Sequence, residues 1–153
     1  MSADGAGDNA YGAPTIVPEG PFAGWTTWGL GTDPYETHLG PFCFRVVDGR
    51  AQCAFEPKPH HCNGGGAIHG GALMSFADFS LFSIAHNALT DGVKAVTLSC
   101  NCEFISAGTL DGWIESDGDV LRVTRSLIFV RGLIRQRTRP VLAFSGALKK
   151  IGL

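Results

Sequence analysis

The side chain with the clearest chemical potential in this sequence is Asp78, the one carboxylate in a long apolar run, residues 72–90 (ALMSFADFSLFSIAHNALT). An ionised carboxylate in an apolar core is strongly destabilising unless it is paired or hydrogen-bonded. Two interpretations follow. Asp78 is either a functional carboxylate that faces a pocket or a subunit boundary, or a structural residue that is satisfied by Ser75 or by a backbone amide.

A glycine-rich loop, residues 63–71 (NGGGAIHGG), leads into the same run. If a helix begins after this loop, its first N–H groups are free and its dipole adds about half a positive charge. Such a terminus can bind an anion or stabilise the oxyanion of an acyl-transfer intermediate. A plain loop that enters a helix accounts for the same glycines. The loop is not a phosphate-binding loop, because no Gly-Lys-Ser/Thr follows it and GxGxxG is absent.

The side chains near this loop that could suggest a metal are His60, His61, Cys62 and His69. Adjacent histidines do not both point into one tight site without a special turn, and no second Cys/His pair has ligand spacing, so we expect no metal site. No serine lies in a GxSxG motif, which disfavours a serine hydrolase. Core packing is expected for His86, Cys100 and Cys102.

The elements that would position these residues begin with a β-hairpin. Residues 42–55 contain the dipeptide Asp48-Gly49, the strongest short signal of such a turn. The alternation predicts an inner face made of Phe42, Phe44, Val46, Ala51, Cys53 and Phe55, with Cys43 and Ala54 on the outer face. Because Cys43 and Cys53 then lie on opposite faces, we expect no disulfide between them.

A helix and several strands follow the hairpin. The run 72–90 has no Gly or Pro, spans about five helical turns and is apolar nearly all round, which predicts a buried helix. Its polar residues disfavour a membrane span. Residues 94–153 read as long strands, with turn signals at Gly108, Asp117-Gly118 and Thr138–Pro140. This order predicts an α+β fold in which one antiparallel sheet wraps around one helix.

The composition fits one globular domain. The chain has 153 residues, of which 44% are apolar and 17% charged, and this excludes a wholly disordered chain and a charge-rich coiled coil. We expect residues 1–41 to form a flexible arm (1–21) and a strap with a helical turn near Pro34–His38, and residues 42–153 to form the compact domain. An odd count of five cysteines without CxxC, and no N-terminal signal peptide, predict a cytoplasmic protein.

The charge is unevenly distributed. The net charge is −2, yet residues 122–153 contain eight basic residues and no acidic one. Arg131 and Arg135 share one face of a predicted strand, opposite Ile128 and Ile134. This basic face either balances the acidic first half of the chain or binds a small anionic ligand, such as the phosphates of a cofactor. The overall charge is not basic enough to indicate a nucleic-acid-binding protein.

The sequence His69-Gly70-Gly71, followed by Asp78 and then by Val96-Thr97 at the start of a long strand, resembles the hotdog-fold acyl-CoA thioesterases, and among them the phenylacetic-acid-degradation type. The resemblance covers about residues 42–150. It implies the hotdog fold, an antiparallel sheet wrapped around one long helix. It also implies a homodimer, often paired into a homotetramer, with active sites between subunits. No cofactor is implied beyond the coenzyme A of the substrate.

The resemblance further implies roles for single residues. Asp78 is similar to the family's catalytic carboxylate, a general base or a nucleophile, and the Gly70 amide to its oxyanion donor. Asn63 is similar to the residue that helps place the water or the thioester, and His69 to the histidine that orders the loop. Thr97 lies where some members have a hydroxyl that helps hold water. The triple glycine after Asn63 departs from the family pattern and affects how Asn63 is held.

We therefore expect an acyl-CoA thioesterase that hydrolyses its substrate to a free acid and coenzyme A, with no nucleic-acid or membrane partner. The residues expected beside the acyl chain are Gly71, Phe76, Phe79 and Phe82, and those expected near the phosphates of coenzyme A are Arg131 and Arg135. One alternative is a non-catalytic acyl-CoA-binding module, against which the presence of Asp78 argues. Another is a hotdog hydratase or dehydratase, whose usual Asp/His dyad is not evident.

Overall fold

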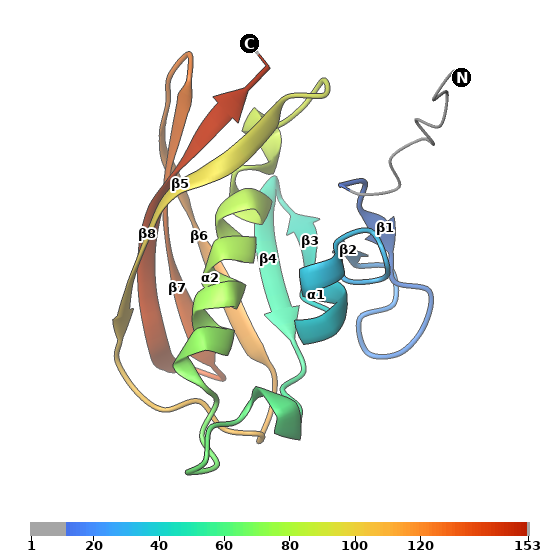
Figure 1. The fold of residues 1–153 in the computed structure, drawn as a ribbon, viewed down its shortest axis with the longest axis vertical. Coiled ribbons are helices and arrows are strands. Elements are labelled where there is room, and N and C mark those ends of the chain that lie inside the picture. Colours follow the sequence, from blue (N-terminus) through green and yellow to red (C-terminus); the bar gives the residue numbers. More distant parts are fainter. Residues whose placement is uncertain (1–11, 153) are drawn as a thin grey trace, which may run out of the picture. The chain divides into compact units, whose positions relative to one another are not determined.

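The structure, a computed structural model, describes residues 12–152 (Figure 1). The chain divides into two units, Met1–Cys43 and Phe44–Leu153. Residues 1–11 of the expected flexible arm lie outside the described residues. The elements of the first unit are β1 (Thr15–Ile16), β2 (Thr26–Thr27) and α1 (Pro34–Leu39). Strands β1 and β2 pair antiparallel, and α1 lies where the sequence predicts a helical turn.

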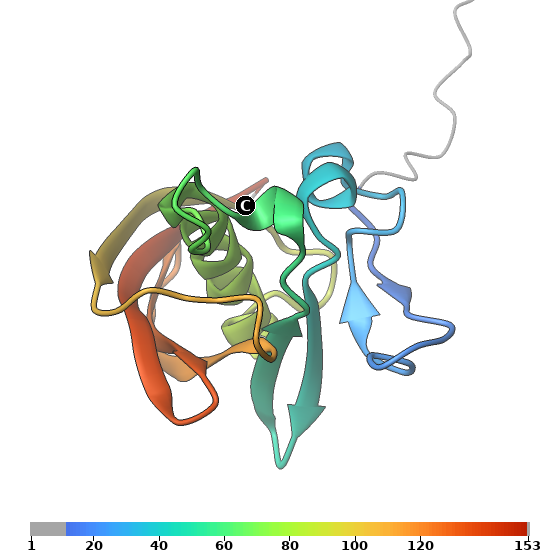
Figure 2. The same ribbon diagram turned by 90° about the horizontal axis from the view of Figure 1, so that it is seen from below.

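The second unit is an antiparallel sheet that wraps around helix α2 (Gly70–Ile84), as Figure 2 shows. The strands follow the order β3-β4-β6-β7-β8-β5, which places β5 at one edge. The predicted hotdog arrangement is therefore confirmed. The strands are β3 (Cys43–Val47), β4 (Arg50–Phe55), β5 (Lys94–Phe104), β6 (Ile114–Val123), β7 (Leu127–Gln136) and β8 (Arg139–Ile151).

Helix α2 packs against the sheet through aromatic residues. The ring centroids of Phe76 and Phe55 on β4 are 4.9 Å apart, and those of Phe79 and Phe44 on β3 are 6.2 Å apart. Both pairs are edge-to-face, which the quadrupoles of aromatic rings favour. These contacts bury the sheet side of the helix, which forms the centre of the core.

The opposite side of α2 is less covered than the sequence predicts. Gly71 and Met74 are exposed, and Asp78 and Phe82 are half-buried. These four positions recur every three or four residues and so form one stripe along the helix. The expectation of a helix buried all round is wrong for a single copy of the chain, because nothing in the described residues fully covers this stripe.

Helix α2 also ends earlier than predicted, at Ile84, and the chain continues as the 3₁₀ helix η2 (His86–Ala88). His86 Nδ1 lies 2.9 Å from the Ser83 carbonyl oxygen. A continuing helix would use this carbonyl as a backbone acceptor. Among residues 12–152, no helix has the length and apolar character needed to cross a membrane.

Two glycines let strands β6 and β7 pack closely against each other and against the Phe144 ring. Gly118 on β6 and Gly132 on β7 lie directly opposite each other. A Cβ on Gly132 would be 2.6 Å from the Asp117 carbonyl oxygen and would overlap the ring of Phe144. The predicted turn at Asp117-Gly118 is therefore wrong, because both residues lie inside β6 and the chain turns only at residues 124–126. Close packing, not a turn, requires glycine here.

The hairpin of β3 and β4 turns at Asp48-Gly49, as predicted. Both residues have positive φ angles, 50° and 77°, as a type I′ turn requires. The predicted inner face is wrong at Val46, which is 46% exposed, because the tip of the hairpin extends past α2 (Figure 2). Cys43 and Ala54, assigned to the outer face, are fully buried. None of the five cysteines, all of which lie within residues 12–152, forms a disulfide.

Candidate active site

The carboxylate of Asp78 is held by a residue on the neighbouring edge strand. The Thr97 hydroxyl on β5 donates a hydrogen bond to Asp78 Oδ1 at 2.6 Å. The register of β5 against β8 shifts between Thr97 and Ser99, and such a bulge redirects side chains locally. Asp78 is half-buried, so it borders on solvent and is not enclosed in the core. This geometry keeps one carboxylate oxygen in a fixed orientation at an accessible position.

Two thiols of strand β5, those of Cys100 and Cys102, lie near the Asp78 carboxylate. The Sγ atoms of Cys100 and Cys102 are 3.9 Å apart. Burial, the neighbouring thiol and the charge of Asp78 raise the pKa of Cys100 to about 12, and burial chiefly raises the pKa of Cys102. Both groups therefore keep their protons at neutral pH. The two thiols are therefore neutral, weakly polar neighbours of the carboxylate, whereas the sequence predicts only that they pack in the core.

The start of α2 presents one backbone donor. His69 caps the helix: its Nδ1 accepts a hydrogen bond from the Gly71 N–H at 2.8 Å, and its carbonyl accepts one from the Ala72 N–H at 3.0 Å. Within residues 12–152, the Gly70 N–H has no hydrogen-bond acceptor. A free N–H at the positive end of a helix can stabilise an anion. His69 thus orders this turn directly.

The Phe104 ring fixes the surroundings of the same donor. A Cβ on Gly70 would lie 3.1 Å from Phe104 Cε1, which is shorter than most Cβ contacts in proteins. The glycine therefore lets the end of β5 pack against the first turn of α2. Sequence reasoning did not identify Phe104, because nothing in the spacing of residues 70 and 104 indicates that they meet.

Asn63 holds its own loop. Its Oδ1 accepts hydrogen bonds from the N–H groups of Gly65 (2.9 Å) and Ala67 (3.2 Å), and the side chain is exposed. In the described part of the chain, no hydrogen bond joins Asn63 to Asp78. The Asn63 side chain thus closes a turn that contains the triple glycine.

Asp78 and Gly70 do not meet within one chain. They are eight positions apart in the α-helix, and at the helical rise this is about 12 Å along the axis of α2. A carboxylate and an oxyanion donor that act on one carbonyl group must both lie within a few ångströms of it. One chain therefore supplies both groups but places them at different points along the helix.

The aromatic residues expected near the acyl chain differ in position. Phe76 and Phe79 are 0% and 2% exposed, and they pack into the core through the ring contacts described above. Phe82 is half-buried and lies on the same helix stripe as Asp78 and Gly71. Of the three phenylalanines, only Phe82 borders the surface next to the carboxylate.

The basic face of the sheet is paired with acids on β6. Arg135 Nη1 lies 2.9 Å from Asp117 Oδ1, and Arg131 Nε lies 3.7 Å from Asp119 Oδ2. Asp119 also pairs with Arg50 on β4, at 2.9 Å. The segment after residue 122 looks unbalanced in the sequence because these acids precede it, but strand pairing brings the opposite charges together. Both guanidinium groups already have acidic partners, so their contact with phosphates stays a prediction.

The histidines near the loop serve the backbone. His61, on the 3₁₀ helix η1 (Pro59–His61), is 2% exposed, and its Nδ1 accepts a hydrogen bond from the Lys58 N–H at 2.8 Å. His69 caps α2. Across residues 12–152, no group of three or more His, Cys, Asp and Glu side chains is arranged to hold a metal ion.

A helix wrapped by an antiparallel sheet is the hotdog arrangement, and this helix carries a half-buried carboxylate and begins with an N–H that has no acceptor among residues 12–152. Residues 65–143, more than half of the chain, match the thioesterase superfamily. The chain belongs to this superfamily and is a thioester hydrolase.

Individual relatives agree with this assignment. The chain is 27% identical over 109 residues to the Pseudomonas aeruginosa protein named "Putative esterase PA0474", a match that covers 71% of this chain and 81% of that protein. The conserved protein PA5202 of Pseudomonas aeruginosa is 27% identical, with a TM-score of 0.70 over 78% of this chain and 94% of that one. A mutant of the phenylacetic acid degradation protein PaaI from Thermus thermophilus is 26% identical, with a TM-score of 0.66 over 78% and 100% of the two chains.

Proposed function

We propose that this protein hydrolyses an acyl-CoA thioester to a free carboxylic acid and coenzyme A, with Asp78 as the reacting carboxylate. The observation that carries the proposal is the Thr97–Asp78 hydrogen bond of 2.6 Å, which orients an accessible carboxylate on the central helix of a thioesterase-superfamily fold. As a general base, Asp78 takes a proton from water while the water oxygen adds to the thioester carbon. As a nucleophile, it forms an anhydride that water then cleaves.

In either route the carbonyl oxygen becomes an oxyanion, and we assign its stabilisation to the Gly70 N–H. When the tetrahedral intermediate collapses, the C–S bond breaks and the coenzyme A thiolate leaves and takes up a proton. His69 keeps the first turn of the helix in place through its hydrogen bond from Gly71. Asn63 orders the preceding loop and helps place the water or the thioester. The reaction as proposed needs no metal and no cofactor other than the coenzyme A of the substrate.

The site is proposed to combine two copies of the chain. Because Asp78 and Gly70 are about 12 Å apart along one helix, the Asp78 of one copy would act with the Gly70 of another. The uncovered stripe on α2 and the edge position of β5 suit this arrangement, since a second copy can cover both. We therefore propose a homodimer, or a homotetramer built from two dimers.

For the acyl group we propose contact with Phe82 and Met74, which flank Asp78 on the same stripe. The Thermus relative is named for phenylacetic acid degradation, which makes aromatic acyl groups the first candidates. A reducing compartment such as the cytoplasm suits an enzyme in which none of the five cysteines, all within residues 12–152, forms a disulfide.

The test is release of free thiol from a panel of acyl-CoA esters with aromatic, short and medium acyl groups, measured for the natural chain and for Asp78→Asn. We expect turnover by the natural chain and a loss of kcat of about 10²–10⁴ in the variant, the usual contribution of a positioned acid or base. The folded fraction should be similar, because Asp78 is only half-buried. An unchanged kcat in Asp78→Asn contradicts the mechanism. Coenzyme A binding without turnover indicates a binding module, and conversion without free thiol indicates a hydratase.

A further inference from the structure

We propose that Gln136, at the end of β7, is a positioning residue for the backbone that carries the Gly70 N–H. It acts through the loop between β5 and β6, residues 105–113. The inference rests on the proposed function only for the role of the Gly70 N–H. The hydrogen bonds that hold the loop are present in the structure whatever reaction the protein catalyses.

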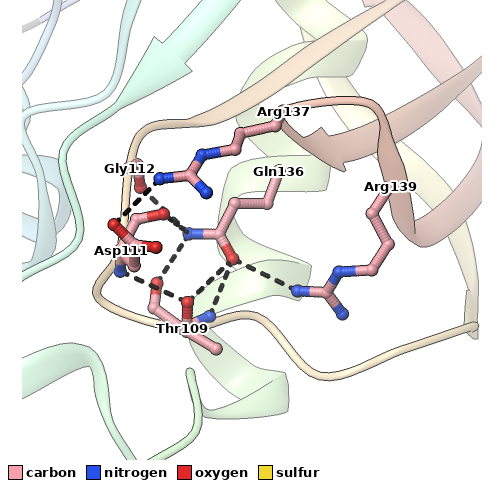
Figure 3. Close-up of polar contacts among 6 residues, drawn as sticks. All are labelled: Thr109, Asp111, Gly112, Gln136, Arg137 and Arg139. Carbon is pink, nitrogen blue, oxygen red and sulfur yellow. Dashed lines mark hydrogen bonds and ion pairs between the residues drawn. The ribbon is translucent and has the colours of Figure 1, made fainter.

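Gln136 holds one half of this loop, as Figure 3 shows. Its side-chain Nε2 donates to the carbonyl oxygens of Thr109 (2.8 Å), Asp111 (3.2 Å) and Gly112 (3.0 Å). Its Oε1 accepts from the N–H (3.0 Å) and the hydroxyl (3.2 Å) of Thr109. Gln136 is 4% exposed. A side-chain amide carries an N–H₂ donor group and a separate acceptor oxygen, so few replacements can satisfy all of these buried backbone groups.

Arg139 holds the other half of the loop from the same turn between β7 and β8. Its Nη1 donates to the Ser106 hydroxyl at 2.9 Å and to the Ala107 carbonyl oxygen at 2.7 Å. Its Nη2 lies 3.4 Å from Gln136 Oε1, which links the two halves (Figure 3). Side-chain hydrogen bonds from Gln136 and Arg139 therefore hold the loop on both sides of residue 108.

Gly108 connects this loop to the backbone that begins helix α2. Its carbonyl oxygen accepts a hydrogen bond from the Ile68 N–H at 2.9 Å. The two residues are packed closely, because a Cβ on Gly108 would lie 3.1 Å from Ile68 Cγ1. Ile68 is buried and immediately precedes the cap His69 and then Gly70. The direction of the Gly70 N–H thus depends on where Gly108 is held.

A loop released at residues 109–112 would let the Gly108 carbonyl move and would loosen the Ile68–Gly70 backbone. Displacements of about 1 Å can reduce a rate by about 10²-fold even when they arise far from the chemistry. Substrate binding involves many other contacts and should change less. The expected signature of Gln136 is therefore an effect on kcat that exceeds the effect on KM.

The experiment compares variants of the full chain in two measurements, thiol release from acyl-CoA and hydrogen exchange of the Ile68 amide. For Gln136→Leu we expect kcat to fall about 10- to 100-fold, with little change in KM and faster exchange at Ile68. Gln136→Glu keeps the acceptor for Thr109 but places a carboxylate oxygen, which has no proton to donate, against three carbonyl oxygens, so its kcat should fall at least as far as that of Gln136→Leu.

The matched control is Arg137→Ala. It removes an exposed ion pair with Asp111, 3.0 Å long, on the same loop and leaves Gln136 in place. Its kcat and Ile68 exchange should equal those of the natural chain. If Gln136→Leu does not fold, Arg139→Ala tests the other half of the grip at an exposed position and should show the same signature.

The outcomes separate the two proposals. A variant with a lower Tm but unchanged kcat per folded molecule and unchanged Ile68 exchange makes Gln136 merely structural and overturns this inference. If the natural chain releases thiol from none of the acyl-CoA esters, the proposed function fails. In that case the Ile68 exchange alone decides whether Gln136 positions this backbone.

Discussion

At the scale of single residues, the two glycines that begin α2 differ in what their amides do. The Gly71 N–H is used by the His69 imidazole, whereas the Gly70 N–H has no acceptor among residues 12–152. A functional test must therefore remove the amide hydrogen of Gly70 without disturbing the turn. Proline can do this, because the first helical position tolerates it and the extended conformation of His69 (φ −61°, ψ 137°) suits a following proline.

We expect Gly70→Pro to lower kcat by about 10²–10³ relative to Gly70→Ala, which is the usual effect of removing one oxyanion donor. Gly70→Ala is the matched control, since its Cβ meets the Phe104 ring just as that of proline does but its N–H is retained. Thiol release and Tm are measured for both. Equal kcat values in the two variants would remove the Gly70 amide from the mechanism.

A second residue-scale prediction concerns pH. Burial raises the pKa of Cys53 from 9.0 to about 11, against hydrogen bonds from Ser116, Ser80 and Ser83 that lower it. The unfolded chain therefore loses this proton at lower pH than the folded protein. The stabilisation is complete below pH 9 and is lost as the pH rises from about 9 to about 11. Urea unfolding from pH 8 to 11 should show this decline, and Cys53→Ala should show a shallower one.

The residues of the candidate site were predictable where chemistry and spacing are local. Asp78 stood out as a lone carboxylate in an apolar run, and the HGG sequence indicated a helix start. Gln136 and Phe104 were not predictable, because each contacts a loop or helix distant in sequence and neither belongs to a motif. The ion pair of Asp117 with the basic face was not predictable for the same reason: only strand pairing places Asp117 beside Arg135.

At the scale of elements, the close packing of β6, β7 and Phe144 depends on glycine. Gly132→Ala would push a methyl group against the Asp117 carbonyl and the Phe144 ring. Overpacking of this kind is destabilising by about 1–3 kcal/mol, which exceeds the roughly 0.4–1 kcal/mol that alanine gains by restricting the unfolded chain. We expect Tm to fall by roughly 3–10 °C. A rise in Tm would show that the sheet has room for the side chain.

The element pattern was predictable because hydrophobic periodicity is strong in this chain. The alternation that placed Ile128 and Ile134 on one face is confirmed, since both are 0% exposed. The prediction of a turn at Asp117-Gly118 was wrong because an Asp-Gly dipeptide occurs both in tight turns and where two backbones approach closely. The sequence alone does not distinguish them, since the element that approaches lies far away in the chain.

At the scale of the whole molecule, one chain leaves apolar side chains exposed on the α2 stripe that carries Asp78 and on the edge strand β5. Met74 is 43% exposed, and Leu98 on the edge strand β5 is 59% exposed. Unpaired edges and apolar stripes favour association. We expect light scattering to give at least twice the mass of one chain. A monomer mass at every concentration would contradict the proposed two-copy site.

Subunit mixing tests the composite site directly. Inactive Asp78→Asn and inactive Gly70→Pro proteins are unfolded together and refolded as a mixture. In a mixed dimer, one site receives both defects and the other receives none. Because half of the dimers are mixed, we expect about one quarter of the natural activity to return in a symmetric dimer. No recovery, with mixed dimers confirmed by mass spectrometry, would place both groups in one subunit.

The pairing of β5 with β8 also dictates when the site can be assembled during synthesis. Strand β5 carries Thr97, and its neighbour in the sheet is the last strand, with Lys94 opposite Ile151. Gln136 and Arg139, which hold the loop behind the helix start, also come from the last fifth of the chain. While a ribosome is still adding these residues, α2 can form but neither Thr97 nor Gly108 has its final support. Catalytic competence should therefore appear only after the C-terminal strand has emerged and folded back.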